Sequence, residues 1–143
     1  MVFYFDTYAL KKWYCSDYLC NELKGLEDHQ AKWYISAVSE REFYIWLNLK
    51  GLPLKDFEER FITVDINPEF EAARIGWRGF FEHIFAKMDV NNIRNFREAI
   101  EIFFLEILMG NKGVTKNQLI FVTNEQEIDL WLSYNGFRSY LIR

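Results

Sequence analysis

Acidic and hydroxyl side chains stand at the ends of several apolar segments of this 143-residue chain. Asp6 directly follows the first of these segments, and Ser36 ends the second, with Glu42 six positions later. Thr123 and Glu125 end a third segment near the C-terminus. Carboxylate oxygens are ligands of Mg²⁺ and Mn²⁺, and two such ions can generate a hydroxide nucleophile for phosphodiester hydrolysis. If the segments are parallel strands, their acids meet beyond the carboxyl edge of the sheet and could bind a cation there.

Other common chemistries lack their motifs in this sequence. We find no Gly-rich dinucleotide fingerprint, no phosphate-cradling P-loop and no Gly-x-Ser-x-Gly nucleophile elbow. Tyr8 stands where an aspartyl-phosphate phosphatase would have a second Asp after Asp6. His29 and His83 are far apart and have no companion ligand at a metal-binding spacing, which argues against a zinc site. The acidic cluster is therefore the main candidate site.

The elements that must position these acids alternate between strand and helix patterns. Strands are predicted at 2–5, 32–36, 61–64, 119–123 and 137–142. Helices are predicted at about 7–24, from Ser39 to Gly51, from Asn67 through Met88, at about 93–109 with Gly110 and Gly113 ending it, and at about 125–135. This alternation predicts a single α/β domain over residues 1–143, with a parallel sheet and helices on both faces.

The order of these motifs resembles the PIN domain family over nearly the whole chain. The stretch from Phe3 to Leu10 resembles the family's opening strand and first metal aspartate, and Ile35 to Glu42 resembles its second motif. The stretch from Phe61 to Arg74 resembles the strand and helix entry that usually come next. Finally, Leu119 to Glu125 resembles the late strand with its Thr and following acid.

The resemblance implies a three-layer α/β/α sandwich with a five-stranded parallel sheet of order 3-2-1-4-5, and a Mg²⁺- or Mn²⁺-dependent endoribonuclease. The implied metal ligands are Asp6, Glu42, Glu98 and Glu125, with Thr123 beside them as a further catalytic residue. The third and fourth of these acids are more often Asp in the family. Glu98 fits the third position best, and Asp89 is the weaker candidate for that position.

Each acid also has an ordinary structural explanation. Asp6 could be a turn residue that ends a strand, and Glu42 has the spacing of a capping box with Ser39. Glu98 could pair with Arg94 one helical turn earlier, and Glu125 could be a first-turn acid that the helix dipole favours. Ser36, like Thr123, could either orient a carboxylate or cap a helix.

The amino-acid composition indicates which kinds of binding partner we expect. A net charge of −4 argues against general electrostatic binding of duplex nucleic acid, although a local basic path for RNA is conceivable. The basic residues considered for that path are Lys11, Lys12, Arg41, Arg94 and Arg97. An aromatic content of 19% exceeds what a small core usually needs, which favours a homodimer or a surface for a partner such as an antitoxin protein.

The cellular setting follows from similar observations. Cys15 and Cys20 are too far apart on a helix for a disulfide, so both are predicted to be free thiols in a reducing compartment. The chain shows neither an export signal nor a membrane-spanning segment, and we expect a cytoplasmic protein. The function predicted is an endoribonuclease that acts on single-stranded or structured RNA, and small members of such families are often toxins of toxin–antitoxin pairs. The alternative is a PIN-like scaffold without catalysis that binds protein or RNA.

Overall fold

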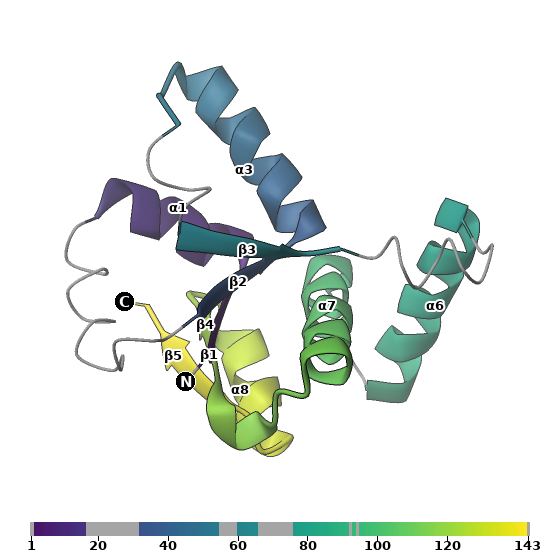
Figure 1. Cartoon of the computed structure of the whole chain (residues 1–143). Coiled ribbons are helices and arrows are strands. Elements are labelled where there is room, and N and C mark those ends of the chain that lie inside the picture. Colours follow the sequence, from purple (N-terminus) through teal and green to yellow (C-terminus); the bar gives the residue numbers. More distant parts are fainter. Residues whose placement is uncertain are drawn as a thin grey trace.

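A computed structural model describes residues 2–16, 32–54, 60–65, 76–91, 93 and 95–142 (Figure 1). The strands are β1 (Val2–Phe5), β2 (Lys32–Ser36), β3 (Phe61–Val64), β4 (Leu119–Thr123) and β5 (Arg138–Leu141). The helices are α1 (Thr7–Cys15), α3 (Ala37–Lys50), α6 (Gly76–Asn91), α7 (Phe96–Lys112) and α8 (Gln126–Tyr134), with a short 3-10 helix η1 at Lys116–Gln118. The five strand positions predicted from sequence are confirmed.

The strands form a parallel five-stranded sheet in the order β3-β2-β1-β4-β5. In the register of the sheet, Phe5 of β1 lies beside Ile35 of β2 and Val122 of β4. The order of the strands along the sheet reverses between β1 and β4, because the chain builds outward from β1 first on one side and then on the other. The predicted fold class is thereby confirmed, and the carboxyl ends of β1 and β4 meet at the reversal point.

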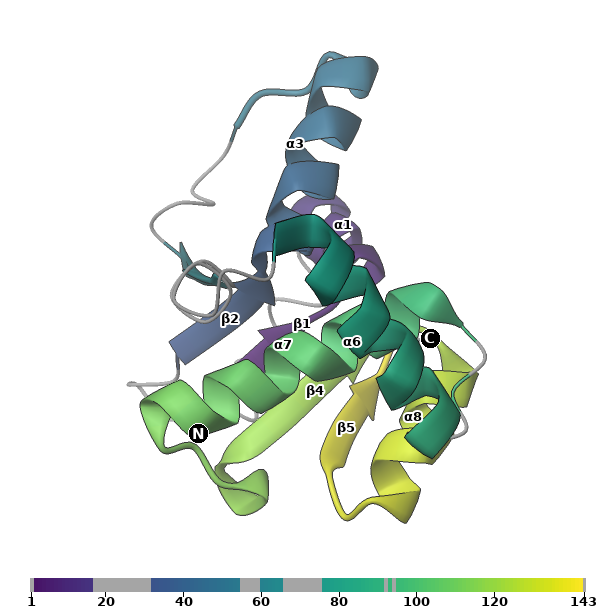
Figure 2. The ribbon, with the colours of Figure 1, turned by 90° about the vertical axis from the view of Figure 1, so that its right-hand side faces the viewer.

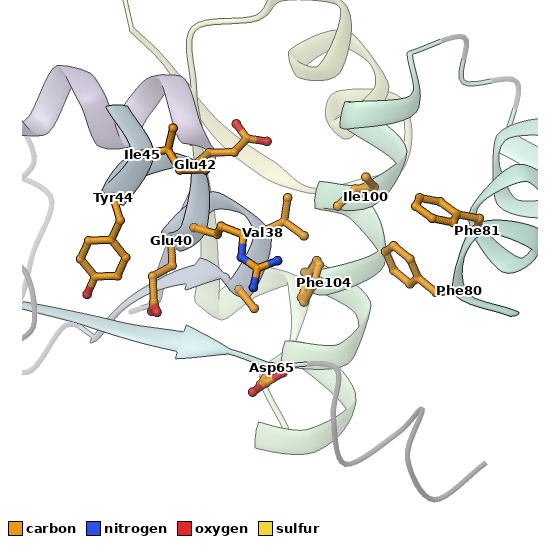
Figure 3. A pocket seen from close by; sticks show the side chains of 12 residues that line it. Val38, Glu40, Glu42, Tyr44, Ile45, Asp65, Phe80, Phe81, Ile100 and Phe104 are labelled. Carbon is orange, nitrogen blue, oxygen red and sulfur yellow. The ribbon is translucent and has the colours of Figure 1, made fainter. Parts of the chain in front are cut away.

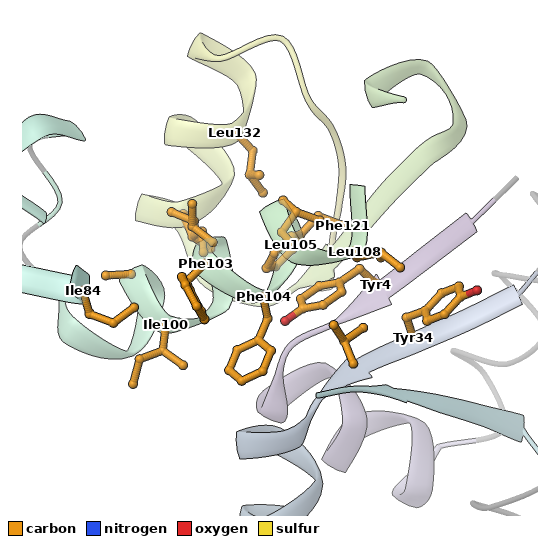
Figure 4. Packing of buried hydrophobic residues seen from close by; sticks show 14 of the residues in the cluster. Tyr4, Tyr34, Ile84, Ile100, Phe103, Phe104, Leu105, Leu108, Phe121 and Leu132 are labelled. Carbon is orange, nitrogen blue, oxygen red and sulfur yellow. The ribbon is translucent and has the colours of Figure 1, made fainter. Parts of the chain in front are cut away.

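Alternate side chains of each strand enter two separate cores, as the two-residue period of a strand requires. Phe3 and Phe5 point to the face covered by α1 and α3, where they pack with Trp33. Tyr4 points to the opposite face and packs against Phe121, beneath α7 (Figure 4). Since both faces are covered by helices, the central strands are apolar throughout and show no alternation of polar residues.

Helix α7 lies between the sheet and another helix. Figure 2 shows α6 on the outer side of α7, and Phe80 of α6 contacts Phe103 of α7 with ring centroids 5.4 Å apart. As a result α7 is buried on most sides: every residue from Ala99 to Leu105 is buried. One of these residues is an acid, Glu101, which is 3% exposed.

Several helix boundaries differ from the sequence prediction. Helix α3 begins at Ala37, and its N-cap is Ser36, whose Oγ accepts a hydrogen bond of 2.9 Å from the backbone N–H of Ser39. The predicted capping box of Ser39 and Glu42 is therefore wrong, because the strand turns directly into the helix three residues earlier. Helix α7 begins only after its N-cap, Asn95.

The third difference is at the end of α7. Gly110, which was predicted to end this helix, lies inside it, and the helix continues to Lys112. Gly113 then ends it in the left-handed conformation at φ 63°, which costs a glycine little.

The helix predicted at about 7–24 is wrong in its length, because α1 ends at Cys15 and its C-cap, Ser16, has an extended backbone. Some predictions fall outside the described residues: the helix start at Asn67, residues 17–24 of that predicted helix, Cys20, His29 and Arg94. Within the described ranges, Cys15 is a free, exposed thiol and His83 is exposed on α6. No helix in the part of the chain that the structure describes is both long and apolar enough to cross a membrane.

Candidate functional site

The buried polar side chains of the described residues lie together at the carboxyl ends of the strands. The six that are buried are Asp6, Thr7, Ser36, Ser39, Glu101 and Thr123, which we call the buried polar network. They come from the ends of β1, β2 and β4, from the first turns of α1 and α3, and from α7. Burying polar groups costs free energy unless they are hydrogen-bonded, so their concentration at one place marks a candidate site.

Asp6 and Thr123 join the two central strands at the reversal point. The Thr123 hydroxyl donates a hydrogen bond of 2.5 Å to Oδ2 of Asp6, and it accepts one of 3.0 Å from the backbone N–H of Glu125. The other oxygen of Asp6, Oδ1, accepts a bond of 2.8 Å from the backbone N–H of Ala9. Asp6 thus caps α1, a role that the sequence analysis did not predict, and its carboxyl is fixed in place at the strand end.

The environment of Asp6 disfavours its charged form. Burial raises the pKa of this carboxyl from 3.8 to about 6, and the negative charge of Glu125 contributes to the rise. The hydrogen bonds from Thr123 and Ala9, and the positive charge of Arg97, act in the opposite direction. A carboxyl with this pKa exchanges its proton near neutral pH, where a cation could take the proton's place.

A small cavity of about 50 Å³ opens beside Asp6. We call it the acidic cavity; its lining residues are Asp6, Tyr8, Asn95, Arg97, Glu98, Glu101, Glu125 and Ile128. Glu98 is in the first turn of α7, and burial raises the pKa of its carboxyl to about 7, with further increases from Glu127, Glu125 and Asp6. The structure therefore brings three predicted acids, Asp6, Glu98 and Glu125, to one cavity.

Glu101 is a member of this site that the sequence analysis missed. Its Oε2 accepts a hydrogen bond of 2.6 Å from the Tyr4 hydroxyl, and its Oε1 accepts bonds of 2.6 Å from Ser39 and 3.3 Å from Ser36. The Ser39 hydroxyl also lies 2.8 Å from that of Thr7, which extends the network to α1. These three donors lower the pKa of Glu101, but burial outweighs them and raises it from 4.5 to about 7.

Glu42, the second predicted metal ligand, lies apart from the acidic cavity. Its carboxylate forms an ion pair with the guanidinium of Arg97, about one-third of each side chain being exposed. Glu42 lines a larger cavity of about 720 Å³ between α3, α6 and α7 (Figure 3). In this view Glu40 and Glu42 point in opposite directions from α3. Arg97 thus stands between Glu42 and the other acids, since it lines the acidic cavity itself.

The remaining candidates are scattered. Asp89 is exposed on α6 and lines neither of the two cavities, whereas Glu98 does line one. Lys12 and Arg41 are exposed, and Lys11 is half-buried beside Tyr8. Of the basic residues that the structure describes, Arg97 is the one that lines the acidic cavity.

The donor chemistry of the acidic cavity suits a hard divalent cation, because its acids offer carboxylate oxygens and their mutual repulsion would be relieved by positive charge. In the arrangement observed, however, no group of three or more His, Cys, Asp or Glu side chains among the described residues is placed to hold a metal ion. Glu98 and Glu125 are half-buried and line the cavity with Asp6, so binding a cation there would require these acids to move closer together.

Comparison with models of known protein families, with curated proteins and with solved structures finds no match for this chain.

Proposed function

We propose that this protein is a Mg²⁺- or Mn²⁺-dependent endoribonuclease of the PIN type, with its site in the acidic cavity. The observation that carries the proposal is that Asp6, Glu98 and Glu101, whose carboxyl pKa values are all raised to about 6 or 7, line one cavity. This cavity lies at the strand-order reversal of a sheet whose order is the one that the PIN resemblance implies.

Each residue of the site has its own role in this proposal. Asp6 and Glu98 would hold the cation with Glu125, and a bound cation would activate water and balance the charge of the phosphate. Thr123 holds Asp6 in one orientation through its hydroxyl. Glu101 accepts hydrogen bonds from Ser36 and Ser39 and thereby fixes the turn between β2 and α3. It is therefore a positioning residue.

The proposal includes a cytoplasmic location and a restraining partner, either an antitoxin protein or a second copy of the chain. The partner is supported by aromatic side chains that the fold leaves exposed. Phe81 and Phe85 of α6 are 40% and 56% exposed, and both contact the ring of Phe96. Large exposed aromatic groups of this kind are commonly covered by a partner.

The test is cleavage of single-stranded RNA in the presence of Mn²⁺ by the wild-type protein and by Asp6→Asn. Asparagine retains an oxygen that can accept the Ala9 hydrogen bond, so the helix cap survives while the charge is lost. We expect cleavage by the wild type and none by the variant. The matched control is Asp89→Asn, which makes the same change at an exposed position of α6 and should cleave like the wild type. Equal cleavage by wild type and Asp6→Asn would refute the proposal.

The second candidate function is a PIN-like module that binds RNA or protein without catalysis. It is favoured by the ion pair that holds Glu42 at Arg97 and by the lack, among the residues described, of a three-acid group placed for a metal. Calorimetric titration with Mn²⁺ separates the two candidates. Absence of heat at millimolar Mn²⁺ would favour the binding module.

A further inference from the structure

Aromatic and basic side chains lie together around Tyr8, which lines the acidic cavity. We call these residues the aromatic rim: Tyr8 and Lys11 of α1, Trp46 of α3 and Arg97 of α7. Tyr8 lines the cavity and is nevertheless 39% exposed, although it is a large ring placed only two residues after the buried Asp6. A half-exposed aromatic ring beside a candidate site is suited to contact a ligand.

Two cations lie near the Tyr8 ring. The Cζ atom of Arg97 lies 5.1 Å from the ring centroid, and Nζ of Lys11 lies 5.8 Å from it. The same Nζ is 5.8 Å from the ring of Trp46, so Lys11 lies near both aromatic side chains. Such distances are within the range of cation–π attraction, which holds the basic groups against the rings.

The two basic side chains of the rim lie near each other. Both approach the same Tyr8 ring, and burial lowers the pKa of Lys11, with a smaller contribution from the positive charge of Arg97. An anionic group in contact with both side chains would relieve the repulsion between them. Arg97 already forms an ion pair with Glu42 and lines the acidic cavity with Asp6, so a phosphate would add to these contacts and not replace them. The rim therefore offers an aromatic surface and an anion-binding position next to each other.

We propose that the aromatic rim binds one nucleotide of a single-stranded RNA, with its base stacked on Tyr8 and its phosphate at Lys11 and Arg97. The choice of RNA rests on the proposed function. Stacking on aromatic side chains together with a basic backbone contact is the usual means of binding single strands, because every base has a π-face to offer. A duplex keeps its bases stacked inside the helix, where Tyr8 could not reach them.

This nucleotide would lie directly beside the acidic cavity, since Tyr8 and Arg97 line that cavity together with Asp6. The neighbouring phosphate of the strand would then enter the cavity where the cation is proposed. The rim accounts for how a chain with a net charge of −4 could hold a polyanion: its affinity would come from stacking and two local charges rather than from a general positive field.

The experiment measures fluorescence anisotropy of a labelled oligouridylate at low salt in EDTA, so that binding is observed without cleavage. We expect Tyr8→Ala to weaken binding about tenfold and Tyr8→Phe or Tyr8→Trp to preserve it, because a stacked base needs the ring and not the hydroxyl. Lys11→Gln should reduce the salt dependence of binding, as the loss of one phosphate contact requires. The matched control is Tyr134→Ala, which removes a tyrosine that is 89% exposed on α8 and should bind like the wild type.

Several outcomes would overturn the proposal: no binding by the wild type, equal binding by wild type and Tyr8→Ala, or equal weakening by Tyr8→Ala and Tyr8→Phe. Binding of the corresponding duplex with the same affinity and no dependence on Tyr8 would overturn it as well. Circular dichroism of each variant verifies that it is folded. The outcome for the nuclease is separate: Tyr8-dependent binding without cleavage in Mn²⁺ would refute the ribonuclease while the nucleotide subsite stands.

Discussion

The buried carboxyl of Glu101 should make the protein less stable as the pH rises, and Glu101→Gln should remove that dependence. Burial raises the pKa of this group from 4.5 to about 7 in the folded protein. Between these two values the native state holds a proton that the unfolded chain has lost. The contribution of Glu101 to stability is therefore fully present below pH 4.5 and is lost as the pH rises through about 7.

The size of the effect follows from the difference between the two pKa values. About 2.5 pH units separate 4.5 from about 7, and each unit corresponds to about 1.36 kcal/mol, which gives about 3 kcal/mol. Because Glu101 is 3% exposed, solvent screening reduces this figure little. Glutamine fills nearly the same volume and carries no charge at any pH, so the penalty for burying a charge disappears in the variant.

The assay is urea unfolding followed by tryptophan fluorescence at pH values from about 4.5 to 8. Across this range, the unfolding free energy of Glu101→Gln relative to the wild type should increase by about 3 kcal/mol. Asp6 and Glu98 remain in both proteins, so the difference reports mainly on Glu101. The matched control is Glu106→Gln, the same substitution at an exposed position of the same helix. If the curves of Glu101→Gln and wild type run parallel over the whole range, the reasoning about burial is refuted.

Three further predictions concern the acids of the candidate site and the residues around them. Thr123→Val deprives the buried Asp6 carboxyl of its hydroxyl donor and should lower the unfolding free energy by about 1–3 kcal/mol in urea titrations; an unchanged midpoint would contradict this. In calorimetry, Glu98→Gln should weaken Mn²⁺ binding at least about tenfold, because Glu98 lines the acidic cavity. Glu42→Gln should change Mn²⁺ binding less than about twofold, because Glu42 is paired with Arg97. The reverse order would contradict the placement of the site. The affinity for Mn²⁺ should increase from pH about 6 to 8 in the same calorimetric assay. The carboxyls of Asp6 and Glu98, with pKa values of about 6 and about 7, must lose their protons before they can bind the ion. An affinity that does not change with pH would exclude both as ligands.

The parts of the site that the sequence predicted are those set by strand ends. Asp6 and Thr123 each follow from a strand pattern, and the rule for parallel sheets then places them side by side. Both residues could therefore be found from local patterns and one rule of topology. The helix boundaries were less accurate, because Ser36 caps α3 at a position where the pattern alone suggested a strand running into a turn.

The parts that the sequence could not predict depend on contacts between distant segments. Glu101 has the appearance of a polar residue on an amphipathic helix, and only the packing of α7 between the sheet and α6 buries it against Tyr4. Glu42 has the expected spacing after Ser36, but its partner, Arg97, is on another helix far along the chain. No periodicity of the sequence contains these pairings, since they depend on how the layers pack.

The cost of the buried polar network is the strongest reason to regard it as a functional site. The free energy of unfolding of an ordinary domain is about 5–15 kcal/mol. A charge penalty of about 3 kcal/mol at Glu101 is a substantial fraction of that free energy. Helices α1, α3, α7 and α8 all begin at this edge, with N-caps Asp6, Ser36, Asn95 and Glu125. Their dipoles favour negative charge there, at about 0.3–1 kcal/mol each, which offsets only part of the cost. A core selected for stability alone would place apolar side chains at these positions. A site that exchanges protons for a cation would instead keep the acids, because a bound cation would stabilise their charged form, which the protein alone stabilises only in part.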